Sequence, residues 1–243
     1  MDTLEEIRHA LKHLSTDERD TIANWLQELA GTPDRGCRVE EPQPAHARAQ
    51  PPFMTLDEYM EFEEQSSFRH EYVNGVVYAM SGPSLAHARI TGELFVAFKT
   101  HLRGSPCEPF ATDVKLRIRS ETDEIVYYPD VVVACNRDEW GTNYVCNPKL
   151  VIETLSPSTG HIDRREKAMT YRRVSSIEEY VLLEQDTHKV IVHRRAENWK
   201  PHLYMGAQAV AEFRCIGLSV PLAQIYGGTL PTGDNGPSTP STP

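Results

Sequence analysis

Hydrophobic and polar positions along the chain follow the periods of both helices and strands. Apolar residues recur at helical spacing over 4–29 and 85–102, and further helices are expected over 55–64 and about 160–174. Alternating or continuous apolar runs typical of strands occur at 70–80, 113–119, 127–134, 149–155, 179–184 and 189–195. This order of elements predicts an α/β domain with a mixed sheet flanked by helices.

Local signals indicate where several elements begin. Thr55 with Glu58 forms a capping box before a short acidic helix, and Ser84 is placed to cap the helix that follows residue 84. Asn74 and Gly75 favour the left-handed dihedral angles of a type I′ turn, so residues 70–80 are expected to form a β-hairpin. The strand at 113–119 is expected to turn Lys115 and its alternate neighbours outward.

The composition divides the chain into four segments. Residues 1–30 form a predicted helical hairpin with one apolar face, and residues 31–53 are rich in Pro and Ala, which indicates a flexible linker. The main domain is expected over 54–230, and the low-complexity tail 231–243 is expected to be disordered. The hairpin resembles small helical modules of addiction-module components. Its apolar face suits a homodimer contact, a partner protein or a cover for the main domain.

Composition excludes some classes of protein. At 40% hydrophobic and 25% charged, the 243 residues are typical of a globular protein, and no apolar run approaches the roughly 20 residues of a membrane helix. The acidic start does not resemble a secretory signal, and the five scattered cysteines indicate reduced thiols, so a cytoplasmic protein is expected. The net charge of −10 argues against a non-specific nucleic-acid binder, although residues 161–173 are locally basic.

Two acids interrupt the two most apolar strands. Asp130 lies in YYPDVVVA and Glu153 lies in LVIETLSP. An ionised carboxylate in such a strand is costly unless a cation pairs with it. Either acid alone is more simply explained as the partner of an arginine or as a strand-end residue. If the two strands are neighbours, the carboxylates converge, and Mg²⁺ is often held by one or two carboxylates together with water.

These motifs carry a family resemblance. PD at 129–130, ExLSPS at 153–158 and DxxxK at 163–167 resemble the PD-(D/E)XK restriction-endonuclease-like superfamily, and more closely the Uma-two family of predicted endonucleases, over residues 54 to about 226. The superfamily lysine expected two residues after the glutamate is replaced here by Leu155. The resemblance implies that Lys167, on the following helix, takes the place of that lysine. Without the resemblance, Lys167 would be read simply as a solvated residue.

The same resemblance implies further site residues. Glu71 matches a recurrent acid of the family and is a candidate third metal ligand; otherwise it is a cross-strand charge at the surface. His87, in the first turn of its helix, is a candidate phosphate contact or a hydrogen-bonded surface residue. Arg164, Arg165 and Arg172 are candidate contacts to nucleic-acid phosphates, and an arginine-rich helix face is otherwise only solvated.

The function implied is an endonuclease that hydrolyses phosphodiester bonds of DNA with Mg²⁺, or with Mn²⁺ in its place. Asp130, Glu153 and Glu71 would hold the metal, and Lys167 would position or help deprotonate the attacking water, or balance charge in the transition state. Two alternatives from other classes remain: a nucleic-acid-binding protein without turnover, and an interaction protein of a toxin–antitoxin-like pair that binds through the N-terminal hairpin.

Overall fold

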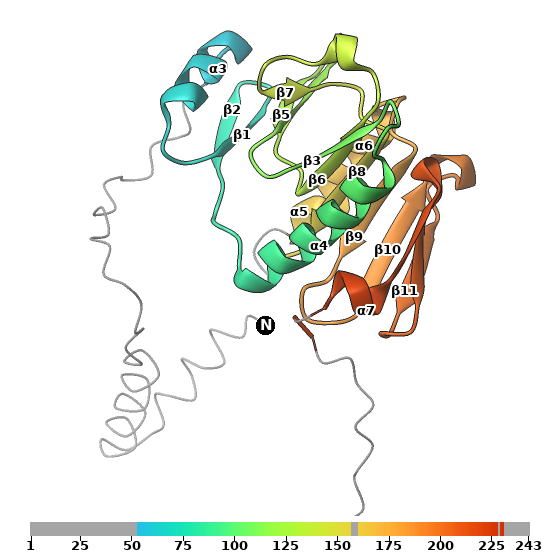
Figure 1. Ribbon diagram of the computed structural model, residues 1–243. Coiled ribbons are helices and arrows are strands. Elements are labelled where there is room, and N and C mark those ends of the chain that lie inside the picture. The colour runs from blue at the N-terminus through green and yellow to red at the C-terminus, as the bar shows by residue number, and fades with distance from the viewer. Residues whose placement is uncertain (1–52, 157–159, 228, 231–243) are drawn as a thin grey trace, which may run out of the picture. The chain divides into compact units, whose positions relative to one another are not determined.

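The computed structural model describes residues 53–156, 160–227 and 229–230 (Figure 1). The predicted N-terminal hairpin, the linker up to residue 52 and the C-terminal tail lie outside these residues. Within them the predicted fold class is confirmed, because mixed β-sheets are flanked by helices. Among the described helices, none is long and apolar enough to span a membrane.

The first helix and hairpin follow the local signals of the sequence. Helix α3 (Leu56–Gln65) begins with the predicted capping box, in which Thr55 and Glu58 bond reciprocally. Strands β1 (His70–Val73) and β2 (Val76–Ala79) pair as a hairpin. Asn74 and Gly75 at its turn have φ angles of 48° and 95°, as a type I′ turn requires.

A six-stranded sheet forms the centre of the domain, in the order β11-β10-β9-β8-β6-β3. Strand β8 runs parallel to β9, and all other neighbours are antiparallel. The strands are β3 (Glu108–Ala111), β6 (Val131–Ala134), β8 (Leu150–Thr154), β9 (Glu179–Leu183), β10 (Lys189–Arg194) and β11 (Pro201–Met205). Strands β6, β8 and β9 are buried throughout, which accounts for their continuous apolar sequences.

A five-stranded sheet, in the order β2-β1-β5-β4-β7, lies beside the first. Its remaining strands are β4 (Lys115–Arg119), β5 (Glu124–Tyr127) and β7 (Tyr144–Val145). The sequence does not predict this division, because residues 127–134 read as one strand. Residues 128–130 instead connect β5 in one sheet to β6 in the other. Pro129 has no N–H to donate to a sheet ladder, which favours a break there.

Two apolar layers cover the central sheet. On one face α4 (Leu85–His101), capped by Ser84 as predicted, packs on β3, β6 and β8, and Figure 1 shows it crossing them. On the other face α5 (Gly160–Ile162), η2 (Asp163–Lys167) and α6 (Ala168–Arg173) form one continuous helical segment, in which η2 is a π-helix. Leu155 is buried on this second face, against Ala168 and Tyr171.

The C-terminal part completes the first layer. Strands β12 (Val210–Phe213) and β13 (Leu218–Pro221) form a separate antiparallel hairpin, and α7 (Leu222–Ile225) follows. Phe213, Val220 and Leu222 join the α4 side chains in one core cluster. Short 3-10 turns occupy η1 (Arg137–Glu139), η3 (Arg195–Glu197) and η4 (Arg214–Ile216).

Two further expectations from the sequence are wrong. Lys115 is buried rather than outward-facing, and its ammonium lies 5.6 Å from the centre of the Tyr128 ring. Cys107 and Cys135 are not free thiols but form a disulfide. They flank β3 and β6 directly, because Glu108 pairs with Ala134 in the ladder. The sequence does not indicate this pair, because Cys107 and Cys135 are 28 residues apart and come together only through the antiparallel register of β3 and β6.

Candidate active site

The strand register places Asp130 and Glu153 side by side. Strands β6 and β8 pair with Val131 opposite Ile152, so the same register continued by one residue sets Asp130 opposite Glu153. Directly opposite residues of an antiparallel pair point to the same sheet face. For Glu153 that face is the one covered by α5, η2 and α6, because Val151 and Leu155 belong to the core on that side. Asp130 lies directly before β6, at the end of the sheet, where His87 of α4 also reaches it.

Asp130 is held by two donors. Its Oδ2 accepts a hydrogen bond from the Thr154 N–H at 2.6 Å and lies 2.9 Å from Nε2 of His87. His87 reaches this position from the first turn of α4, where its own N–H bonds to the Ser84 hydroxyl at 3.1 Å. The N-cap of α4 therefore sets the place of the imidazole beside the carboxylate.

The second acid, Glu153, is surrounded by donors from the helical segment. Its Oε1 accepts hydrogen bonds from Lys167 Nζ at 3.2 Å and from the Tyr171 hydroxyl at 3.0 Å. The Glu153 side chain is only 5% exposed, and this burial raises the pKa of its carboxyl well above the ordinary value, although Lys167 opposes the rise. The glutamate in the apolar run LVIET thus faces a lysine ammonium.

Lys167 joins three acids. Its Nζ lies 2.8 Å from Glu71 Oε1 and 3.4 Å from Asp163 Oδ1, in addition to Glu153. Burial by itself lowers the pKa of Lys167, but the three carboxylates outweigh burial and hold that pKa well above its usual value. Lys167 therefore carries its charge in the protein interior, 5.2 Å from the centre of the Tyr127 ring.

Asp163 and Lys167 lie in the π-helix η2, one turn apart, with both side chains turned toward the sheet. Single-turn π segments are frequently found at functional sites. Burial raises the pKa of Asp163, as it does that of Glu153. The sequence indicated Asp163 only as the first residue of the DxxxK motif, and Asp163 was not expected in the site. Sequence reasoning also missed Tyr171, which stands four residues after Lys167 and could have been found from that spacing.

The predicted arginine contacts lie on the other side of the same segment. Arg164, Arg165 and Arg172 are exposed and line a hollow of about 440 Å³ with Met169. Arg164 also pairs with Glu184. Because Asp163 and Lys167 are buried while the arginines are exposed, the arginines do not contact the carboxylates.

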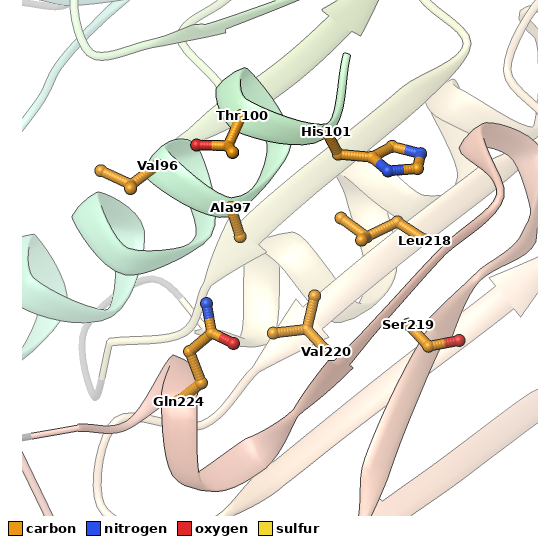
Figure 2. A pocket seen from close by; sticks show the side chains of 8 residues that line it. All are labelled: Val96, Ala97, Thr100, His101, Leu218, Ser219, Val220 and Gln224. Carbon is orange, nitrogen blue, oxygen red and sulfur yellow. The ribbon is translucent and has the colours of Figure 1, made fainter. Parts of the chain in front are cut away.

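A second hollow lies between α4 and β13 (Figure 2). Its volume is about 340 Å³, and its lining includes Val96, Leu218, Val220 and Gln224. His101 is the one titratable residue of the lining, and its Nε2 lies 2.8 Å from the Ile216 carbonyl oxygen. A hollow lined in this way offers no acid–base pair, so the carboxylate cluster remains the candidate site.

The donor atoms of the cluster suit a hard cation. Carboxylate oxygens of Glu71, Asp130, Glu153 and Asp163 are the ligands that Mg²⁺ and Mn²⁺ prefer. These acids outnumber the single lysine, so a cation would offset buried negative charge. Within the described part of the chain, however, no three His, Cys, Asp or Glu side chains are grouped as a ready-made metal site. The donor set therefore fits an ion held by one or two carboxylates better than one enclosed in a cage.

Comparison with known proteins places this chain in a family. The sequence profile of the Uma2 family, described as "Putative restriction endonuclease", matches residues 56–223. Two proteins of Synechocystis sp. (strain ATCC 27184 / PCC 6803 / Kazusa) are similar over most of their length. "Uncharacterized protein slr1290" is 33% identical, over 76% of this chain and 97% of its own. "Uncharacterized protein sll1609" is 30% identical, over 66% and 92%.

A solved structure shares the fold. The crystal structure of "a putative nuclease belonging to DUF820" from Anabaena variabilis ATCC 29413 matches with a TM-score of 0.60. The match covers 73% of this chain and 99% of that protein, at 16% sequence identity. At that identity the likeness establishes a common fold and no more.

Proposed function

The chain belongs to the Uma2 family of restriction-endonuclease-like proteins, and from this premise we propose that it is a Mg²⁺-dependent endonuclease that hydrolyses phosphodiester bonds of DNA. The observation that carries the proposal is the contact of Lys167 with Glu71, Glu153 and Asp163 inside the protein, next to the strand end from which Asp130 bonds to the Thr154 N–H. Three acids around one lysine leave buried negative charge that a bound cation would offset.

The metal would be held by Asp130 and Glu153. Glu71, the further ligand implied by the resemblance, pairs with Lys167 at 2.8 Å and would have to leave it to bind the metal directly. A bound Mg²⁺ or Mn²⁺ supplies a Lewis acid for the phosphate and lowers the pKa of a coordinated water. Both ions take oxygen ligands, which is why either is expected to support activity.

The other side chains orient these carboxylates. The Thr154 N–H and His87 fix one oxygen of Asp130, which leaves its second oxygen for a ligand. Tyr171 and Lys167 fix Oε1 of Glu153 in the same way. Preorganised groups of this kind need no rearrangement when charge develops in the transition state.

Lys167 is the candidate for charge balance. Its ammonium keeps the proton under neutral conditions, because the surrounding carboxylates hold its pKa well above the usual value. A lysine that stays protonated stabilises negative charge on a phosphoryl group and orients water through its N–H groups, but it does not act as a general base. This favours positioning and charge balance over deprotonation of water.

The test is a plasmid-cleavage assay of the purified full chain with Mg²⁺, with Mn²⁺ and with EDTA. We expect cleavage with either metal and none with EDTA. Asp130→Asn and Glu153→Gln are each expected to lower the rate by at least about 100-fold, since each removes an anionic ligand. Glu93→Gln, an exposed substitution on α4, is the matched control and should cleave like the parent.

If Asp130→Asn and Glu153→Gln both cleave like the parent, the activity does not come from this site. Binding of DNA without cleavage in any metal would instead favour a nucleic-acid-binding protein that keeps the fold without turnover. Co-purification of an intact partner protein, without cleavage, would favour the toxin–antitoxin-like interaction protein.

A further inference from the structure

Strand β11 ends the six-stranded sheet, and in the described part of the chain no strand pairs with its outer side. The ladder with β10 pairs Lys189 with Met205, and the Gly206 N–H donates to the His188 carbonyl oxygen at 2.9 Å. Hydrogen-bonded pairs alternate along an antiparallel ladder, so the even-numbered residues of β11 bond to β10. Leu203 and Met205 therefore direct their N–H and C=O groups toward the open edge.

The side chains of this edge are apolar and exposed. Leu203 is 53% exposed and Met205 is 61% exposed, and Leu203 lies beside Ile191 on the same sheet face. Proteins usually protect such edges with charged residues, proline or a bulge. Residues 201–211 contain no Asp, Glu, Lys or Arg, and Pro201 protects only its own position. The edge thus retains the features of a pairing surface.

We propose that β11 pairs antiparallel with β11 of a second copy of this chain, about a two-fold axis at Leu203. Leu203 is the middle residue of the strand, so this axis uses its whole length. Each Leu203 N–H then donates to the Leu203 carbonyl oxygen of the other copy, and each Met205 N–H donates to the Pro201 carbonyl oxygen. The two Leu203 side chains meet on one sheet face as a cross-strand apolar pair.

The chemistry of the edge favours a second copy as the occupant. Pro201 has no N–H, and the two-fold register places it opposite Met205, so each outward N–H of the strand finds an acceptor. Because the segment has no Asp, Glu, Lys or Arg, self-pairing brings no like charges together. A two-fold contact is closed, so it covers both edges at once and leaves no open strand for further growth.

This surface is distinct from the N-terminal hairpin, which is the dimer contact suggested by the sequence and lies outside the described residues. It also does not depend on nuclease activity. The two-fold axis through the hydrogen-bonded pair is perpendicular to the joined sheet. The segments α5–η2–α6 of both copies therefore lie on the same face of that sheet.

The first test is the mass of the full chain in solution, measured by sedimentation over a range of concentrations. We expect a dimer for the parent and a monomer for Leu203→Lys, which places a charge on the axis. Val96→Lys is the matched control, because Val96 is 60% exposed but lies on α4, and it should remain a dimer. Circular dichroism of each variant should match the parent, since both positions are at the surface.

The second test measures the register by disulfide cross-linking of Leu203→Cys and Met205→Cys under mild oxidation. Hydrogen-bonded pairs have Cα atoms about 5.5 Å apart, which a disulfide can bridge. The proposed axis brings position 203 of the two copies to that spacing, whereas position 205 of one copy lies roughly 13 Å along the strands from position 205 of the other. We expect Leu203→Cys to form covalent dimers and Met205→Cys to form few.

Three results would overturn the proposal. A parent that is monomeric at every concentration would mean that the edge stays open or is covered by another segment or protein. A Leu203→Lys chain that remains dimeric would place the interface elsewhere. Equal cross-linking of Leu203→Cys and Met205→Cys, or none for the former, would exclude the register with Leu203 on the axis.

Discussion

Lys167 and Glu153 lie fourteen residues apart in the chain, yet the lysine ammonium is 3.2 Å from the glutamate carboxylate inside the protein. Their side chains are only 8% and 5% exposed. Removing the lysine would leave three buried acids without a counter-charge, whereas removing one of the acids would leave Lys167 paired with the other two.

The first prediction concerns Glu153→Gln and the pH dependence of stability. Burial raises the pKa of Glu153 in the folded protein, whereas in the unfolded chain its pKa is about 4.3. The parent therefore loses stability as the pH rises above that value, by about 1.4 kcal/mol for each unit of pKa elevation. Urea unfolding in EDTA should show Glu153→Gln gaining stability over the parent from pH 4 to pH 8.

Near pH 3 the two proteins should converge, because Glu153 is protonated in the folded state and almost fully so in the unfolded state at that pH. The exposed control Glu93→Gln should follow the parent over the whole range. A variant less stable than the parent at pH 8 would mean that the ion pair with Lys167 outweighs the cost of burial.

The second prediction concerns Lys167→Met, which keeps the bulk of the side chain and removes its charge. Glu71, Glu153 and Asp163 would then face one another without a counter-charge. Breaking a buried ionic group typically costs about 3–5 kcal/mol. Urea unfolding in EDTA at pH 8 should show a loss of that order, with a smaller loss at pH 5, where Glu153 and Asp163 can take up protons.

Lys99→Met is the matched control on the exposed side of α4 and should change stability by less than about 0.5 kcal/mol. Equal effects of the two substitutions would contradict the contacts of Lys167 described above.

The third prediction concerns the disulfide between Cys107 and Cys135, which joins the ends of β3 and β6. Strand β6 begins directly after Asp130, so the disulfide anchors the far end of a strand that leads into the site. Replacing both cysteines by serine should lower the free energy of unfolding by about 2–4 kcal/mol. Urea unfolding of the oxidised proteins measures this loss, and Cys146→Ser, which removes a free thiol, should have little effect.

If a reducing agent leaves the parent as stable as before, the disulfide contributes no stability under those conditions. Thiol titration of the denatured protein should find two fewer free thiols in the oxidised parent than in the reduced one, and a full complement in both would contradict the bond.

The fourth prediction concerns Arg172, which lines the outer hollow of the helical segment. If it contacts a flanking phosphate, Arg172→Ala should raise KM several-fold and leave kcat nearly unchanged. The slope of the logarithm of the DNA-binding constant against the logarithm of the salt concentration should also fall in magnitude by about one. Arg103→Ala, an exposed arginine beyond α4, is the control and should change neither quantity. A fall in kcat without a change in the salt slope would exclude a phosphate contact by Arg172.

Much of the local structure could be predicted from the sequence because it depends on neighbouring residues. The capping box of Thr55 and Glu58, the type I′ turn at Asn74 and the Ser84 cap all form from groups within four residues of one another. The continuous apolar run 150–152 indicated a central strand for a similar reason, since a strand covered on both faces has no polar side.

The sequence by itself also determined which residues are out of place: acids in apolar strands, and a leucine where the superfamily has lysine. Only the tertiary structure decided what they contact. The antiparallel register of β6 and β8 brought the start of β6, next to Asp130, beside the end of β8, which holds Glu153. The π-helical turn turned Asp163 and Lys167 toward Glu153.

The pairing of Cys107 with Cys135, the burial of Lys115 and the outward position of the arginines were likewise settled only in three dimensions. The physical reason is the same in each case. Local propensities act over a few residues, whereas the cost of burying a charge depends on partners that the fold brings from distant parts of the chain.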